Sequence, residues 1–366
     1  MTRISRRTAL TTAAGVVTLP FVSRLAHARD LGEQVGPLLM LGFAGASTAA
    51  PDAPFITRAL ASGSIGGVCF LGHNTKSKAG IEGLTAMFRS APRRRAALIA
   101  VDQEGGAVQR LSPKSGYQDT PSASQIADKG DPSEAVRTYE GMARMMRRAG
   151  FNLNLAPVVD LGFEKRNPII AKYGRAYGND GATVATYAGA FCEGHRRAGM
   201  LTALKHFPGH GSTVIDSHKA PVDLTSTWRE DELEPYRQLV AKGLVDIVMS
   251  GHLAHARMGG VGTPATLSRV AIEEVLRGHC GWQGVVMTDD VDMAAIRSRL
   301  APPEAAVAAL AAGNDMILMS NTAAPDNHLP ERVVEAVRDA ISSGQLKPAR
   351  IEEAAARVDR LAARAA

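Results

Sequence analysis

The chain of 366 residues contains few cysteines and few aromatic residues, and it lacks a regular repeat. Only three residues are Cys and only 5% are aromatic. These numbers exclude a disulfide scaffold, and the absence of a glycine period and of heptads excludes collagen and a coiled coil. A hydrophobic fraction of 45% with 21% charged residues is typical of a folded globular protein. We expect Cys69, Cys192 and Cys280 to be buried thiols, with one disulfide as the alternative.

Acidic residues are missing from residues 1–28, which contain four arginines. Without this segment the formal net charge falls from +6 to +2. Its basic start, its apolar stretch at 9–22 and its small residues Ala26 and Ala28 are typical of a cleaved export signal. The pair Arg6 and Arg7 favours the twin-arginine route. A retained membrane anchor is the alternative, but polar residues and a proline interrupt the short apolar stretch. We therefore expect a mature chain of residues 29–366, located in the periplasm or secreted.

Short apolar runs alternate with longer helical stretches along the mature chain. Runs without polar alternation are typical of strands buried on both faces of a parallel sheet. Eight of them predict an α/β fold with a single TIM (β/α)8 barrel domain over 29–366, and an open doubly wound sheet is the alternative. The strands are expected at 39–43, 67–71, 97–101, 152–156, 201–204, 246–249, 284–287 and 316–319, and connecting helices at 135–149, 183–198, 230–242 and 303–312.

Polar residues follow several of these predicted strands. Such segments occur at 102–110, 205–218, 250–252 and 288–290. In a TIM barrel the carboxyl ends of the strands share one face, and catalytic groups lie there. Helix caps are the alternative explanation for any single residue among them, such as Asp102 or Asp289. The four segments together indicate an active site.

The segment KHFPGHGSTVIDSH at 205–218 resembles glycoside hydrolase family 3, specifically its single-domain β-N-acetylglucosaminidase (β-N-acetylhexosaminidase) branch. Residues 102–110, TPATLS at 263–268 and GVVMTDDVDM at 284–293 support the resemblance, which runs from about Val35 to Met319. It implies a TIM barrel and a retaining hydrolase without a cofactor. The implied reaction removes terminal β-linked N-acetylglucosamine from wall-derived muropeptides or chitin-like oligosaccharides.

The resemblance also implies the catalytic residues. Asp289 matches the nucleophile that forms a covalent glycosyl–enzyme intermediate, and its place directly after a buried strand suits a rigid carboxylate. Asp290 ranks second, because on an extended backbone it points the other way. His218 matches the general acid and base, with Asp216 as its partner. A histidine suits this role because its ordinary pKa of about 6.5 lies near neutrality.

Five further residues match positions that bind sugar hydroxyl groups. The loop after the fourth strand carries extra residues, so Arg166 is an alternative to Arg175 there. We also expect His252 and Met249 to line the pocket, although Met249 equally suits the core. The predicted substrate-binding residues are Asp102, Arg110, Arg175, Lys205 and His206.

A histidine-rich metal site is the alternative use of His206, His210 and His218. Pro208 and Gly209 disfavour it, because they break any helix that would place two of these imidazoles on one face. We therefore predict no metal ion. The family also contains β-glucosidases, and a catalytically inactive secreted sugar-binding protein is a further alternative. A mature charge of about +2 disfavours nucleic acid as a partner, and no stable membrane insertion is expected after signal cleavage.

The export signal gives a first prediction. Replacing Arg6 and Arg7 together with Lys should block export, because the twin-arginine route reads this pair. Fractionation of cells producing the full chain checks this, and the exported protein should begin near Arg29. Unchanged export in a strain lacking the twin-arginine translocase would contradict the predicted route.

Overall fold

The computed structural model describes residues 30–93, 95–216 and 220–365. The predicted export signal and His218 therefore lie outside the described residues. Across these three ranges, no helix combines the length and the apolar composition needed to cross a bilayer.

A sheet of eight parallel strands forms the centre of the molecule. The strands lie in the order β11-β9-β7-β6-β3-β2-β1-β12, and an isolated parallel bridge between Met287 and Met316 brings the two ends together. The sheet therefore nearly closes, which confirms the predicted TIM barrel over the open sheet, and every strand overlaps a predicted run. The strands are β1 (Leu39–Leu41), β2 (Gly67–Phe70), β3 (Leu98–Val101), β6 (Leu153–Asn154), β7 (Leu201–Phe207), β9 (Ile247–Ser250), β11 (Val285–Thr288) and β12 (Ile317–Met319).

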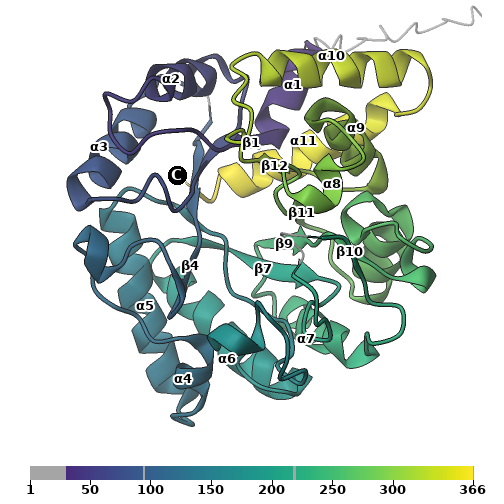
Figure 1. Ribbon diagram of the computed structural model, residues 1–366. Helices are drawn as coiled ribbons and strands as arrows, with labels where there is room; N and C mark the ends of the chain where they lie inside the picture. The colour runs from purple at the N-terminus through teal and green to yellow at the C-terminus, as the bar shows by residue number, and fades with distance from the viewer. Residues whose placement is uncertain (1–29, 94, 217–219, 366) are drawn as a thin grey trace, which may run out of the picture.

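Helices surround the strands (Figure 1). The predicted helices at 135–149, 183–198 and 303–312 are confirmed as α5, α6 and α9. The predicted helix at 230–242 is a 3-10 turn, η4 (Glu230–Leu233), followed by α7, because Pro235 lacks an N–H and suits only a first turn. The longer helices are α2 (Asp52–Ser62), α3 (Lys78–Arg89), α5 (Pro132–Arg148), α6 (Gly181–Arg197), α7 (Glu234–Ala241), the π-helical segment η7 (Val270–His279), α9 (Pro302–Ala312), α10 (Leu329–Ser342) and α11 (Pro348–Ala362).

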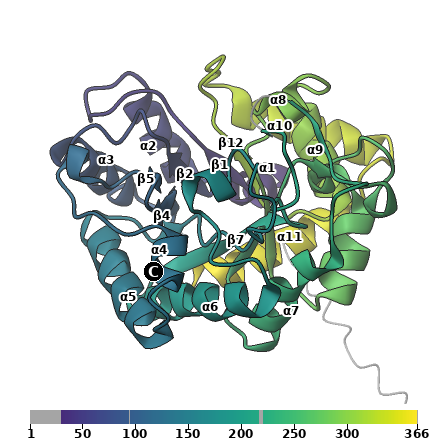
Figure 2. The ribbon, with the colours of Figure 1, turned by 60° about the horizontal axis from the view of Figure 1, so that its bottom comes forward.

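Short elements fill the connections between these helices and strands. β4 and β5 form an antiparallel hairpin after β3, and β8 and β10 pair in parallel beyond β7 and β9. In Figure 2, the helices from α2 to α5 and those from α8 to α10 lie on opposite sides of the central strands. The short elements are α1 (Leu31–Val35), η1 (Gly36–Leu38), β4 (Gln103–Gly105), β5 (Val108–Gln109), η2 (Pro113–Ser115), α4 (Ala123–Ala127), η3 (Ala171–Tyr173), β8 (Val222–Asp223), β10 (Leu253–Ala254), η5 (Ala256–Met258), η6 (Ala265–Leu267) and α8 (Ala294–Arg297).

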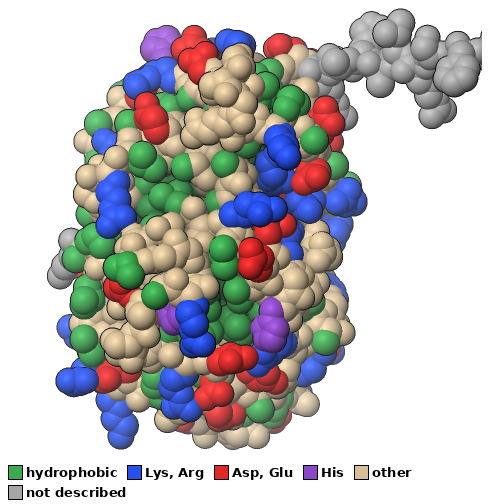
Figure 3. All heavy atoms as spheres, turned by 90° about the vertical axis from the view of Figure 1, so that its right-hand side faces the viewer, with side chains coloured by type: hydrophobic (Ala, Val, Ile, Leu, Met, Phe, Trp, Pro, Cys, Tyr) green, Lys and Arg blue, Asp and Glu red, His purple; other side chains and the backbone are tan. Residues whose placement is uncertain are grey.

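The core is one large apolar cluster that joins the barrel interior to the inner faces of the helices. Its members include the three cysteines, which are buried and unpaired, as predicted for thiols. The outer surface is mixed in charge: on the face in Figure 3, basic side chains lie interspersed with acidic ones.

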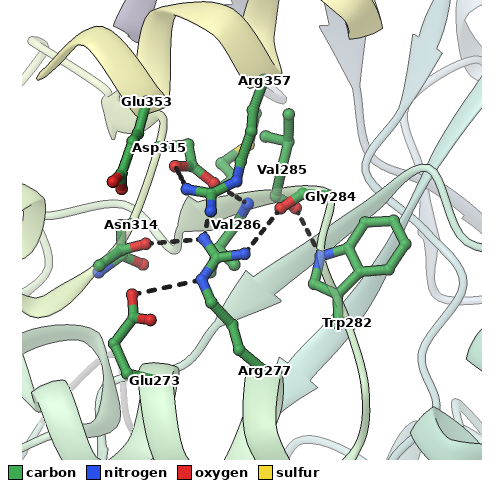
Figure 4. Close-up of polar contacts among 12 residues, drawn as sticks. Glu273, Arg277, Trp282, Gly284, Val285, Val286, Asn314, Asp315, Glu353 and Arg357 are labelled. Carbon is green, nitrogen blue, oxygen red and sulfur yellow. Dashed lines mark hydrogen bonds and ion pairs between the residues drawn. The ribbon is translucent and has the colours of Figure 1, made fainter. Parts of the chain in front are cut away.

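The amino ends of the strands are tied to the last helix through one buried carboxylate, Asp315. Its oxygens accept hydrogen bonds from Arg277 Nη2 at 2.9 Å and from Arg357 Nη1 at 3.1 Å, and Arg350 forms a third ion pair. Asp315 also accepts the backbone N–H of Val286 at 3.0 Å. Figure 4 shows these contacts linking η7, α11 and the start of β11. Three arginines on two helices thus share one fully buried carboxylate as their counter-charge.

Asp315→Asn should lower the free energy of unfolding by about 3–5 kcal/mol, because it leaves buried arginines without their counter-charge. Urea unfolding followed by circular dichroism measures this. Glu134→Gln is the matched control: it breaks the exposed pair with Lys129 and should cost less than about 1 kcal/mol. Equal losses in both variants would contradict the role of Asp315.

Candidate active site

A buried group of charged side chains lies at the carboxyl ends of β3 and β7. Lys205 Nζ contacts Asp102 Oδ1 at 2.7 Å and Glu104 Oε1 at 2.8 Å. The Glu104 carboxylate also accepts hydrogen bonds from Nε and Nη2 of Arg175, at 2.7 and 2.8 Å. The structure therefore brings together three of the predicted residues, Asp102, Lys205 and Arg175, around a carboxylate that was not predicted.

Glu104 stays ionised although it is buried. Burial by itself raises its pKa, but the cations of Arg175 and Lys205 hold that pKa well below its usual range. The sequence did contain a signal for this residue. Asp102 and Glu104 are two apart on an extended segment, so their side chains can point to the same face.

The guanidinium group of Arg175 is buried and hydrogen-bonds to other groups of the protein. Two of its nitrogens bind Glu104, and Nη1 donates to the Ile169 carbonyl at 2.9 Å, while the residue is only 9% exposed. Arg166, the alternative, is exposed and pairs with Glu164 on the same loop. Of the two arginines, Arg175 is therefore the one that reaches the group of Asp102, Glu104 and Lys205. Its two hydrogen bonds orient the Glu104 carboxylate.

His206 is oriented by a second buried carboxylate that was not predicted, Asp160. His206 Nδ1 lies 2.7 Å from Asp160 Oδ2, and Asp160 Oδ1 accepts the backbone N–H groups of His206 and His210 at 3.1 and 2.8 Å. Burial raises the pKa of Asp160, but His206 and these hydrogen bonds outweigh burial and lower it. Because Nδ1 of His206 faces Asp160, the other ring nitrogen, Nε2, faces away from this carboxylate.

Asp289 directly follows β11 and is half-buried. Its backbone N–H donates to the Ser250 carbonyl at 2.9 Å, which extends the pairing of β11 with β9, and its Oδ1 accepts the Asp290 N–H at 2.8 Å. The Asp290 carboxylate instead accepts the backbone N–H groups of Asp292 and Ser320 at 3.0 and 2.9 Å. Burial raises the pKa of Asp290 to about 6. Asp290 thus organises the loops after β11 and β12.

His252 supports the same turn. Its Nε2 donates to the Asp290 carbonyl at 2.8 Å, and its Nδ1 lies 2.9 Å from Thr266 Oγ1. Thr266 belongs to the TPATLS segment and also contacts the Gly251 carbonyl at 2.9 Å. His252 therefore fixes the backbone beside Asp289. Met249, 2% exposed, belongs to the core cluster.

Arg110 lies at the end of the β4–β5 hairpin, whose base is fixed by amide side chains. Gln103 pairs with both backbone groups of Leu111, and Asn154 pairs with both backbone groups of Gln103, all at 2.8–3.0 Å. Asn154 also contacts His195 Nε2 at 3.0 Å. The amide network was not predicted. Within the described ranges, the buried Nε of Arg110 has no hydrogen-bond partner.

Cys69 on β2 shows that these groups converge. Burial raises the pKa of its thiol, the charges of Asp102 and Asp290 raise it further, and Arg110 and Lys205 oppose this. Asp102 after β3, Lys205 on β7 and Asp290 after β11 thus all act on the same buried thiol.

The loop after β7 contains Asp216, which is half-buried and follows the exposed side chains of Val214 and Ile215. Its predicted partner, His218, lies outside the described residues. Among the described residues, no group of three or more His, Cys, Asp or Glu side chains has an arrangement that could hold a metal ion. Charged and amide groups arranged in this way suit a neutral ligand with several hydroxyl groups.

The family model described as "Glycosyl hydrolase family 3 N terminal domain" matches residues 31–361. A β-hexosaminidase of Stenotrophomonas maltophilia is 35% identical over 309 residues, which cover 82% of this chain and 86% of the relative. A β-N-acetylhexosaminidase structure from Beutenbergia cavernae has a TM-score of 0.79 at 31% identity and covers 92% of this chain and 98% of its own. A family 3 β-N-acetylglucosaminidase structure from Paenibacillus has a TM-score of 0.81 at 33% identity, and this chain spans 62% of it.

Glu104→Gln tests the charged group through stability. At pH 7 the free energy of unfolding should fall by about 3–5 kcal/mol, because Lys205 and Arg175 lose a buried counter-charge. The pKa of Glu104 is depressed, so its contribution is present above the ordinary value of 4.5 and is lost as the pH falls below it. The difference between wild type and variant should therefore shrink between pH 4.5 and pH 3 in urea unfolding.

Glu193→Gln is the control, because it breaks an exposed pair with Arg197 on α6. It should change the free energy of unfolding by less than about 1 kcal/mol. A Glu104→Gln difference that stays constant from pH 7 to pH 3 would contradict the ionised state of Glu104.

Proposed function

The chain belongs to glycosyl hydrolase family 3 and is a glycoside hydrolase, and we propose that it removes terminal β-linked N-acetylhexosamine, chiefly N-acetylglucosamine, by a retaining mechanism. The observation that carries the proposal is that Asp289, directly after β11, lies at the same carboxyl end of the barrel as Asp102, directly after β3, and its ion-pair partner Lys205 on β7. The relatives named above, a β-hexosaminidase and a β-N-acetylhexosaminidase, support the sugar specificity.

Asp289 is the proposed nucleophile. Its carboxylate attacks the anomeric carbon, and a carbon–oxygen bond to the enzyme forms while the glycosidic bond breaks. His218 gives the leaving oxygen a proton in this step. It then takes a proton from the water that hydrolyses the glycosyl–enzyme, so the product keeps the β configuration. Asp216 orients and tunes His218.

The remaining residues bind and orient the sugar. Asp102 and Lys205 form a charged pair with hydrogen-bonding capacity toward hydroxyl groups, and Arg110 and His206 contribute N–H groups. Arg175 serves this group through Glu104. In this assignment Asp160 and Glu104 hold the binding side chains in place before the substrate arrives, which lowers the cost of ordering them.

The substrates are wall-derived muropeptides or chitin-like oligosaccharides, met in the periplasm or outside the cell. This part of the proposal rests on the sequence of residues 1–28. The purified chain 29–366 should hydrolyse a nitrophenyl β-N-acetylglucosaminide and leave the matching β-glucoside nearly untouched. The reverse preference would indicate a β-glucosidase, and no hydrolysis of either would indicate a sugar-binding protein.

Variants at Asp289 and His218 should respond differently to the leaving group, because a good leaving group departs without a proton. His218→Ala should lose about a hundredfold or more in kcat/KM on a natural disaccharide and much less on the nitrophenyl sugar. Asp289→Ala should lose both alike, since no intermediate forms. Steady-state kinetics with both substrates measures the split.

Rescue by azide gives the second readout for the same variants. The His218→Ala variant lacks its base for the second step, so azide should restore turnover and yield a β-glycosyl azide. Equal losses on both substrates without rescue would show that another group supplies the proton. A trapped fluorosugar found on a peptide without Asp289 would reject the nucleophile.

A further inference from the structure

The loop that carries Asp216 and His218 begins in a narrow space between two segments. A Cβ at Gly211 would lie 1.9 Å from the Leu161 carbonyl oxygen, and a Cβ at Gly209 would lie 2.3 Å from Glu232 Oε2. Gly209 also has a positive φ of 122°. Only glycine fits at these two positions, so the loop backbone lies directly against Leu161 on one side and Glu232 on the other.

Side chains from outside the loop hold its backbone polar groups. Asp160 Oδ1 accepts the His210 N–H at 2.8 Å, Asn167 Nδ2 donates to the His210 carbonyl at 2.8 Å, and Trp228 Nε1 donates to the Pro208 carbonyl at 3.1 Å. Glu232 Oε2 accepts the Gly211 N–H at 3.0 Å. Of these four contacts, that of Glu232 lies farthest along the loop, five residues before Asp216.

Glu232 differs from Asp160 and Glu104 in having no cationic partner among the residues that the structure describes. It is 1% exposed, and no described Lys, Arg or His nitrogen forms an ion pair with it. Its Oε1 and the Ser212 Oγ are both buried and without a hydrogen-bond partner among the described residues. A buried carboxylate without a counter-charge is costly, whereas a neutral carboxylic acid is not.

The charged groups around Glu232 favour the neutral form. Burial and the negative charge of Asp160 raise the pKa of Glu232 to about 8, although the hydrogen bond from the Gly211 N–H opposes this rise. Tyr236 faces Glu232 from α7. His206, His210 and Arg175 act on Asp160 rather than pairing with Glu232. Near neutrality Glu232 is therefore mostly protonated.

We propose that Glu232 is a positioning residue that, as a neutral acid, fixes the start of the loop carrying Asp216 and His218. The role assigned to those two residues rests on the proposed function. Ionisation of Glu232 places a second negative charge beside Asp160 in a buried space and releases residues 209–213 at the start of the loop. These five residues are thus held in place near neutrality and loosen as the pH rises through about 8.

Hydrogen exchange of the amides at 209–213, followed by mass spectrometry on the full chain, tests this without relying on activity. After correction for the intrinsic rate, wild-type protection should fall about tenfold between pH 7 and pH 9.5. Glu232→Gln mimics the neutral acid and should keep its protection at both pH values. Glu232→Ala should lack protection at both. Glu230→Gln, an exposed change in the same turn, should behave as the wild type.

Activity on the nitrophenyl sugar at pH 7 gives a second measurement. If Glu232 had a purely structural role, its variants would not change kcat separately from KM. Glu232→Ala should lose at least tenfold in kcat with little change in KM, because the sugar-binding residues stay in place, and Glu232→Gln should restore most of kcat. Wild-type protection that does not change with pH, or a Glu232→Gln variant as unprotected as Glu232→Ala, would overturn the proposal. An inactive wild type with the expected exchange pattern would reject the proposed function alone.

Discussion

The pairing of Glu104 with Lys205 and Arg175 is the interaction on which the site depends. One buried carboxylate compensates two buried cations that come from β7 and from the loop after β6. Removing ions from water costs several kcal/mol each, and only close pairing with good geometry returns that free energy. The three segments that carry these residues therefore have little freedom to move apart, and Asp102, which shares Lys205, is fixed with them.

At both ends of the barrel, buried carboxylates are paired with cationic side chains, but these side chains have different roles at the two ends. At the amino ends of the strands, Asp315 is surrounded by three arginines, which join η7 and α11 to β11. At the carboxyl ends, Glu104 and Asp160 are also compensated, but their partners Lys205 and His206 are the predicted sugar-binding residues. The same kind of contact stabilises one end and, in the proposed function, positions sugar-binding groups at the other, as is usual for this fold.

Neutral polar groups complete the site where charge would be unfavourable. Asn154, Gln103 and His195 fix the hairpin before Arg110 through amide and imidazole hydrogen bonds, and burial lowers the pKa of His195 to about 4, which keeps its ring uncharged at neutral pH. Glu232 is also an uncharged polar group in our proposal, because no cation in the described part of the chain pairs with it. Buried polar networks are stable when each donor meets an acceptor, and the network of Gln103, Asn154 and His195 requires no counter-ion.

The sequence alone determined the barrel, because eight apolar runs recur with helical stretches between them. Each run is a pattern of neighbouring residues, so it can be recognised without knowing any tertiary contact. It also placed Asp102, Lys205, His206 and Asp289 at one end, since the carboxyl ends of parallel strands share a face. It did not reveal Glu104, Asp160, Asn154 or Glu232 as parts of the site. A carboxylate next to other polar residues in the sequence has the same pattern whether it is solvated or buried. Only the tertiary structure decides which cation, amide or backbone N–H reaches it from a segment 21 to 71 residues away or farther, and that partner sets its charge and its role.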